Sequence, residues 1–126
     1  MVYILLGTGF EEIEAVAPCD LLRRAGAEVC YAALADAEVT GSHGIVLRAE
    51  KLLSEVSLDD MEMLVLPGGL RGVKSILADE AALALIRKAW EAGKMTMAEA
   101  LRHCNMEKST FYRRRRALHL TRRGKK

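Results

Sequence analysis

The chain has 126 residues, of which 51% are hydrophobic, so it can form the core of one ordinary domain or of a small domain with an appended module. Its first residues, Met-Val-Tyr-Ile-Leu-Leu-Gly, lack a basic region and are too few for a signal peptide or a membrane span. We therefore expect a cytoplasmic protein without a membrane partner. Three cysteines without C-x-x-C spacing argue against a disulfide framework and a zinc site, and we expect neither a metal nor a cofactor.

Charge is distributed unevenly along the chain. Residues 1–93 contain 8 Lys and Arg against 15 Asp and Glu, a balance of −7, whereas residues 94–126 contain 11 against 2, a balance of +9. Such a basic segment is typical of a region that binds a polyanion. The alternative is that the basic tail folds back onto the acidic body.

The first third of the chain predicts strand, helix and strand. An apolar run at 2–6 ends at a glycine-containing loop, a helix follows from about residue 10 to 24 and stops at Gly26, and residues 28–34 form a second strand. Residues 39–47 contain Gly41 and Gly44 between two short β-type runs, which predicts a small hairpin or an extended excursion. The helical spacing predicts that the following residues face the core: Ile13, Val16, Ala17, Leu21 and Leu22.

The stretch at 61–72 is expected to organise the sheet. Its apolar run at 63–66 is too short for a helix and stops at Pro67, Gly68 and Gly69, as a buried parallel strand followed by a tight turn would. Ligands of open α/β sheets lie beyond the carboxyl ends of the strands, and glycines there let backbone N–H groups approach a ligand. The alternative is a turn without a further role.

Two helices are expected after this turn. A short helix or loop lies around 73–77, and a longer helix runs from about 79 to 92, with Asp79 as its N-cap and Gly93 ending it. The apolar side of the longer helix is predicted to consist of Leu83, Leu85, Ile86, Ala89 and Trp90. The order of elements indicates an α/β fold of the doubly wound type with a mostly parallel sheet.

Three separate blocks in this region resemble the first half of the ThiJ/PfpI superfamily. They are G-T-G-F-E-E-I-E-A-V-A-P-C-D-L-L-R-R-A-G-A-E-V, V-T-G-S-H-G-I-V-L and L-V-L-P-G-G, and they occur in that order within residues 1–93. The resemblance implies a flavodoxin-like fold, in which a glutamate on the first helix hydrogen-bonds a reactive cysteine beside the Pro-Gly-Gly turn. These roles fall on Glu14, Gly68 and Gly69.

The chain departs from the superfamily where the reactive cysteine is expected. In the family this cysteine lies on a sharp turn in an A-x-C-x-G-like setting, after a Gly-Lys pair. Here Gly93 and Lys94 are followed by M-T-M-A-E-A-L-R-H-C-N-M, and Cys104 is displaced from that setting. Without its thiol, Glu14 reads as a first-turn carboxylate favoured by the helix dipole. We therefore expect little or no enzymatic turnover and no catalytic residue beyond these remnants.

The basic tail predicts a helix-turn-helix. Residues 96–99, Thr-Met-Ala-Glu, have the spacing of a capping box that starts a helix through about residue 103. A turn at 104–106 and a second helix over about 107–119 follow. The run N-M-E-K-S-T-F-Y-R is similar to the recognition-helix entry of resolvase/invertase-type modules, although Asn105 stands where glycine is commonest. The helix at 79–93 can serve both parts, and a solvated basic helix is the alternative.

Duplex DNA is the partner that this tail predicts. The candidate DNA-contacting residues are Lys108, Ser109, Thr110, Tyr112, Arg113, Arg114, Arg115 and Arg116. Two units follow, a truncated ThiJ/PfpI-like α/β domain at 1–93 and a helix-turn-helix with a basic tail at 94–126. A homodimer is expected, because the strand at 63–66 would keep an open edge.

The first functional hypothesis is a non-catalytic domain coupled to a DNA-binding regulator, with a small-molecule effector as an option. The second is a ThiJ/PfpI-type thiol-dependent enzyme or chaperone, glyoxalase-like or deglycase-like, that acts through Cys104 or Cys19. The third is a fusion or fragment without a function of its own. Absence of the cysteine setting favours the first or the third, and the S-T-F-Y-R string favours the first.

Overall fold

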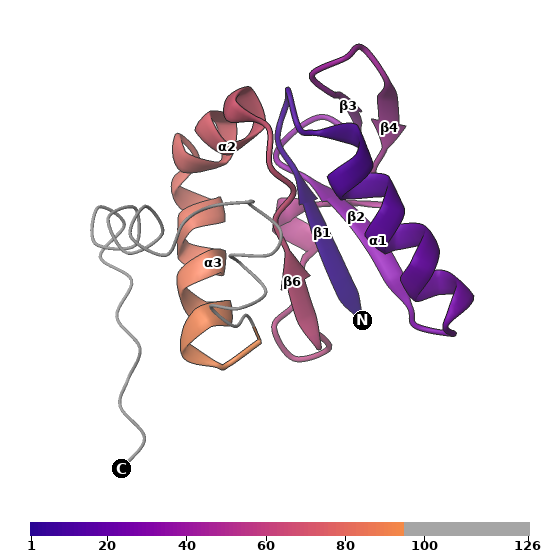
Figure 1. Cartoon of the computed structure of the whole chain (residues 1–126). Coiled ribbons are helices and arrows are strands. Elements are labelled where there is room, and N and C mark those ends of the chain that lie inside the picture. The colour runs from indigo at the N-terminus through magenta and orange to yellow at the C-terminus, as the bar shows by residue number, and fades with distance from the viewer. Residues whose placement is uncertain (95–126) are drawn as a thin grey trace, which may run out of the picture.

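A computed structural model describes residues 1–94, which form a parallel sheet with helices on both faces (Figure 1). The elements in chain order are β1 (Val2–Leu6), α1 (Glu12–Arg24), β2 (Val29–Ala33), β3 (Glu38–Thr40), β4 (Val46–Arg48), β5 (Lys51–Leu52), the 3₁₀ helix η1 (Leu53–Glu55), β6 (Met63–Val65), α2 (Leu70–Leu77) and α3 (Glu80–Glu91). The predicted α/β class with a mostly parallel sheet is confirmed. The predicted helix-turn-helix lies outside the described residues.

The main sheet has the order β5-β2-β1-β6, with every pair parallel, and β3 and β4 form a separate antiparallel hairpin. The prediction that the strand at 63–66 organises the sheet is wrong. β1 and β2 are each paired on both sides, whereas β6 pairs with β1 alone among the described strands. Beside β6, the Leu64 N–H donates to the Lys94 carbonyl at 3.3 Å. The pairing of this edge with a second chain stays a prediction.

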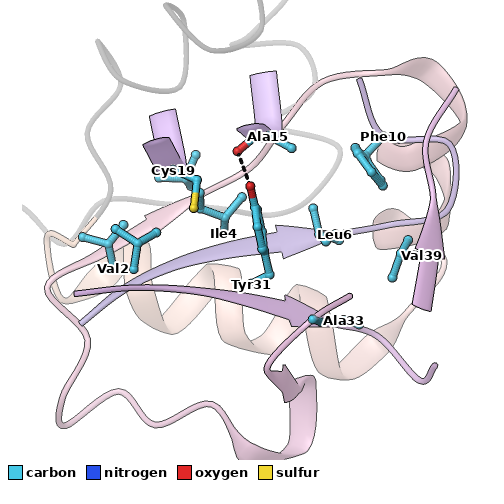
Figure 2. Close-up of a cluster of buried hydrophobic side chains, with 12 residues drawn as sticks. Val2, Ile4, Leu6, Phe10, Ala15, Cys19, Tyr31, Ala33 and Val39 are labelled. Atoms are coloured by element: carbon cyan, nitrogen blue, oxygen red, sulfur yellow. Dashed lines mark hydrogen bonds between the residues drawn. The ribbon is translucent and has the colours of Figure 1, made fainter. Parts of the chain in front are cut away.

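β1 contributes side chains to two hydrophobic cores, because alternate side chains of a strand point to opposite faces of the sheet. Ile4 and Leu6 lie in the core under α1, whereas Tyr3 and Leu5 lie in the core under α2 and α3. Figure 2 shows the first of these cores, in which the Tyr31 hydroxyl donates to the Ala15 carbonyl at 3.1 Å. That bond fixes α1 on β2 and satisfies a polar group that burial would otherwise leave unpaired.

The prediction for the buried side of α1 is wrong for four of its five residues, and only Leu22 packs against the core. The helix buries Glu12, Ala15 and Cys19, while Ile13 is 73% exposed and Leu21 is 65% exposed. The observed face is rotated from the predicted apolar stripe. Ala15 and Cys19 pack in the core against the sheet, and Glu12 contacts the loop between β3 and β4. The reason is that polar contacts to two loops fix the start of α1, as described below, and they override the hydrophobic periodicity.

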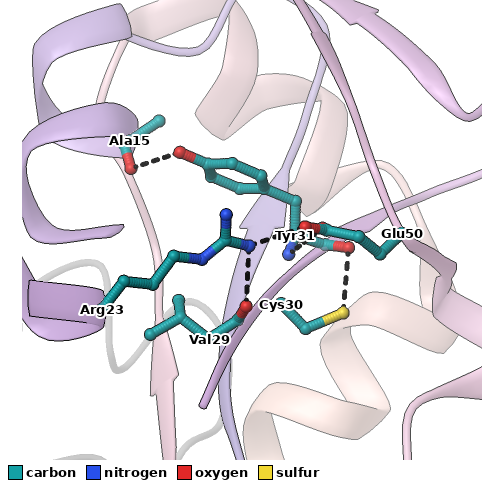
Figure 3. Close-up of polar contacts among 6 residues, drawn as sticks. All are labelled: Ala15, Arg23, Val29, Cys30, Tyr31 and Glu50. Atoms are coloured by element: carbon teal, nitrogen blue, oxygen red, sulfur yellow. Dashed lines mark hydrogen bonds and ion pairs between the residues drawn. The ribbon is translucent and has the colours of Figure 1, made fainter. Parts of the chain in front are cut away.

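A polar cluster holds the other end of α1 against β2 (Figure 3). The Arg23 guanidinium donates to the Val29 carbonyl at 2.8 Å and to Glu50 Oε1 at 2.6 Å, and Glu50 Oε2 accepts from the Tyr31 N–H at 2.7 Å. The hydrogen bond to Glu50 raises the pKa of Arg23, so the guanidinium stays charged. Burial raises the pKa of the Tyr31 hydroxyl, which keeps it neutral.

α3 behaves as its sequence predicts. Asp79 is the N-cap, with Oδ1 accepting from the Ala82 N–H at 2.8 Å, and Gly93 follows the helix with a φ of 72°. Of the predicted apolar side, Ile86, Ala89 and Trp90 are buried and Leu83 and Leu85 are half-buried, and Ala82 joins the buried residues. Within residues 1–94, no helix combines the length and apolarity needed to cross a membrane. A cytoplasmic location stays a prediction.

Candidate active site

The loop after β6 meets the start of α1 beyond the carboxyl ends of the two neighbouring strands. The Glu11 N–H donates to the Gly68 carbonyl at 2.9 Å, and the Glu11 side chain accepts from the Glu14 N–H at 3.0 Å. Glu11 is therefore both the N-cap of α1 and the residue that attaches α1 to the Pro-Gly-Gly turn. A crevice edge of this kind is where open α/β sheets place their ligands.

The structure brings the three predicted site residues together. Glu14 Oε2 accepts a hydrogen bond from the Gly68 N–H, and a Cβ at position 68 would overlap this carboxylate. Gly69 has a φ of 92°, a left-handed conformation that favours glycine, and its carbonyl accepts from the Val73 N–H at 2.9 Å in the first turn of α2. The half-buried Glu14 carboxylate is thus fixed beside a turn that no larger residue would allow.

A second carboxylate, that of Glu12 at the start of α1, contacts the loop between β3 and β4. Glu12 is only 5% exposed, and its Oε1 accepts from the His43 N–H at 2.6 Å. Its Oε2 accepts from the Ser42 hydroxyl at 3.1 Å and lies 3.0 Å from His43 Nδ1. A Cβ at Gly41 would overlap the same carboxylate, so the loop needs glycine to approach it.

These contacts decide the protonation of Glu12. Burial raises the pKa of its carboxyl, but the hydrogen bonds from the His43 side chain and backbone and from Ser42 outweigh burial and lower the pKa to about 2. The hydrogen bond to Glu12 and its negative charge raise the pKa of His43. Glu12 is therefore an anion under all ordinary conditions, and it stabilises the protonated form of His43.

The cysteines of the described region do not contact Glu14. Cys19 lies in the core under α1, near Val2 and Ile4 and away from Phe10 (Figure 2). Cys30 lies in the core on the other face of the sheet, and burial raises the pKa of its thiol. Neither thiol has the exposed, electropositive setting of a reactive cysteine. The second functional hypothesis named Cys104 or Cys19 as the reactive thiol. Burial argues against Cys19, and Cys104 lies outside the described residues.

The predicted DNA-contacting residues, 108–116, also lie outside the described residues. Sequence reasoning missed four residues of the site: Glu11, Glu12, Ser42 and His43. The signals were present, since two glutamates precede the helix and a serine and a histidine occupy the hairpin turn. Their pairing joins segments 31 positions apart and cannot be read from local spacing.

Glu14 lies beside the glycine turn, as the resemblance implied, whereas no cysteine of residues 1–94 hydrogen-bonds its carboxylate. Comparison with known proteins identifies the family. The model of the DJ-1/PfpI family matches residues 1–100. The chain belongs to the DJ-1/PfpI family. A relative from Arabidopsis thaliana, Protein DJ-1 homolog A, is 46% identical over 85 residues, covering 67% of this chain and 22% of the relative. A deglycase from Thermococcus kodakarensis is 36% identical over 93 residues, covering 74% of this chain and 55% of the deglycase.

Solved structures show the same likeness. Toxoplasma gondii DJ-1 in an oxidized form superposes with a TM-score of 0.69 at 36% identity, covering 75% of this chain and 52% of that one. Drosophila melanogaster DJ-1beta gives a TM-score of 0.70 at 30% identity, with coverage of 75% and 51%. The chain spans about half the length of these structures and of the deglycase, and about a fifth of the Arabidopsis relative.

The primary functional hypothesis, a DNA-binding regulator, is wrong. The relatives are named as DJ-1 homologs and deglycases, which supports the second hypothesis, a DJ-1/PfpI-type enzyme or chaperone. The charge balance and one short string in the tail carry less weight than a likeness that extends over residues 1–100. Charge asymmetry reports on solubility and association, and it does not identify a function.

Proposed function

We propose that this chain carries out DJ-1/PfpI-type deglycase chemistry, in which Glu14 acts as the acid-base group at the glycine turn. The observation that carries the proposal is the position of the Glu14 carboxylate. It accepts a hydrogen bond from the Gly68 N–H, beyond the carboxyl ends of β1 and β6. Several relatives that match the chain over about 93 residues are named deglycases, and their names give the reaction class.

The substrate class is an adduct between a small dicarbonyl compound and an amine or thiol. Hydrolysis of such an adduct needs proton transfer at the carbinol oxygen, and a carboxylate held in place by a backbone N–H suits that step. The thiol of this proposal is Cys104, because Cys19 and Cys30 are both buried in the cores. The expectation of little or no turnover, drawn from the missing cysteine setting, is replaced by this proposal.

Turnover of the methylglyoxal adduct of N-acetylarginine by the full chain tests the proposal. Glu14→Gln keeps the size of the side chain and should lower the rate by about a hundredfold or more, in line with the loss of a general acid-base group. Asp20→Asn, on the exposed side of the same helix, is the matched control and should leave the rate unchanged.

Cys104→Ser separates the role of the thiol from that of the carboxylate. Loss of turnover in both Glu14→Gln and Cys104→Ser supports the complete proposal. Loss in Glu14→Gln alone retains the carboxylate and rejects Cys104 as the thiol. No turnover by the unaltered chain above the rate of the adduct in buffer would overturn the assignment of an activity to it.

A further inference from the structure

The start of α1 and the hairpin loop bring three metal-ligating side chains together. Glu11, Glu12 and His43 each offer one ligand atom, and these atoms all lie within 4.8 Å of one another. We propose that they form a site for a divalent zinc-type cation. The proposal is independent of the proposed deglycase chemistry, and it revises the expectation of no metal, which rested on cysteine spacing alone.

The distance between two of the ligand atoms already fits a metal. Glu12 Oε2 and His43 Nδ1 lie 3.0 Å apart. Two ligands that are each about 2.1 Å from a zinc ion are separated by about 3.0 to 3.4 Å, depending on the angle between them. A cation between these two atoms would take the place of the proton that joins them when His43 is protonated, and that proton would leave to solvent.

The backbone holds the two segments in place before any ion arrives. The Ser42 N–H donates to the Phe10 carbonyl at 2.8 Å, and the Gly9 N–H donates to the Thr40 carbonyl at 2.8 Å. These bonds attach the hairpin loop to the residues that precede α1. Binding therefore costs little ordering of the chain.

Access and charge also suit a cation. The His43 side chain is 74% exposed, so an ion can reach Nδ1 without opening the core, and water can complete the coordination. A helix N-terminus carries roughly half a positive charge, which disfavours a cation. Two carboxylates outweigh this charge, and the imidazole nitrogen selects zinc-type ions over calcium or magnesium, which prefer oxygen alone.

Zinc binding by the full chain tests the site, with a chromophoric chelator as competitor and thermal unfolding as a second readout. His43→Ala should weaken Zn²⁺ binding at least about tenfold and abolish the rise in melting temperature that Zn²⁺ produces. Glu11→Gln, at the half-exposed ligand, should weaken binding in the same direction, whereas Glu50→Gln leaves it unchanged. Both substitutions in the site spare the buried Glu12, whose loss would disturb folding.

The remaining histidines and the Cys104 thiol are the competing ligands. A variant with His103→Ala, Cys104→Ser and His119→Ala should bind Zn²⁺ as the unaltered chain does, and the ring signals of His43 should shift with one equivalent of Zn²⁺ in its NMR spectrum. Binding that disappears in this variant and persists in His43→Ala would overturn the proposal. So would the absence of binding at Zn²⁺ concentrations up to about 100-fold above that of the protein.

Discussion

The two long helices lie on opposite faces of the sheet and differ in the residues that they bury (Figure 1). α3 buries Ala82, Ile86, Ala89 and Trp90, as an amphipathic helix does. α1 buries a carboxylate at its start and leaves large apolar side chains in solvent. The start of α1 is therefore fixed by hydrogen bonds to two loops, and it is the part of the molecule where polar groups converge.

The same substitution on the two helices gives the largest expected contrast. Ile86 is 4% exposed and Ile13 is 73% exposed. Ile86→Ala should lower the free energy of unfolding by about 2 to 5 kcal/mol, because it leaves a cavity under α3. Ile13→Ala should change that free energy by about 0.5 kcal/mol or less. Urea unfolding followed by circular dichroism measures both, and similar losses would mean that Ile13 is covered in solution.

The glycine turn gives the next largest effect. A Cβ at Gly68 would overlap the Glu14 carboxylate, so Gly68→Ala should cost about 1 to 3 kcal/mol of unfolding free energy. The cost should fall by at least about 1 kcal/mol when Glu14 is also replaced by alanine, because the overlap is then removed. A double-mutant cycle in urea measures this coupling. If the losses of unfolding free energy from the two single substitutions add up in the double variant, the strain of Gly68→Ala does not come from the Glu14 carboxylate.

Sequence reasoning predicted most of the fold and only part of the site. β1, β2, the hairpin and α3 were predicted because their patterns are local: apolar runs, turn glycines, and Asp79 as a cap. The two residues of β5 were missed, since so short a strand has no period of its own. The central place of β1 was missed as well, because strand order depends on contacts between distant segments.

In the candidate site, too, local patterns were predictable from the sequence and contacts between distant segments were not. Glu14, Gly68 and Gly69 were found through the family blocks, and the structure places them together. The contact between Glu12 and His43 was not found, since a glutamate at the start of a helix and a histidine in a turn are each ordinary on a surface. The buried face of α1 was misjudged for the same reason. Its hydrophobic periodicity pointed to Ile13, whereas long-range hydrogen bonds turn Glu12 inward.

The N-caps of the two helices allow a smaller comparison. Asp79 caps α3 through Ala82, and Glu11 caps α1 through Glu14. Either residue replaced by alanine should cost about 0.5 to 2 kcal/mol of unfolding free energy. Glu11→Ala should also lower the rate of any turnover that depends on Glu14, whereas Asp79→Ala should not, because the cap of α3 is unconnected to the site. Equal effects of both substitutions on turnover would indicate a general loss of folded protein.

The smallest expected effect concerns Cys30, in the core under α2 and α3. Burial and then the charge of Glu50 raise the pKa of its thiol, so the folded state holds that proton more tightly than the unfolded state does. The stabilisation is fully present below the ordinary thiol pKa of about 9.0, and it is lost as pH rises through the higher pKa of the folded state. In a Cys104→Ser chain, alkylation of Cys30 at pH 8.5 should therefore be slow in buffer and fast in urea. Mass spectrometry of the modified peptides separates Cys30 from Cys19. Rapid modification of Cys30 in the folded chain would show that the face under α3 opens more readily than its burial indicates.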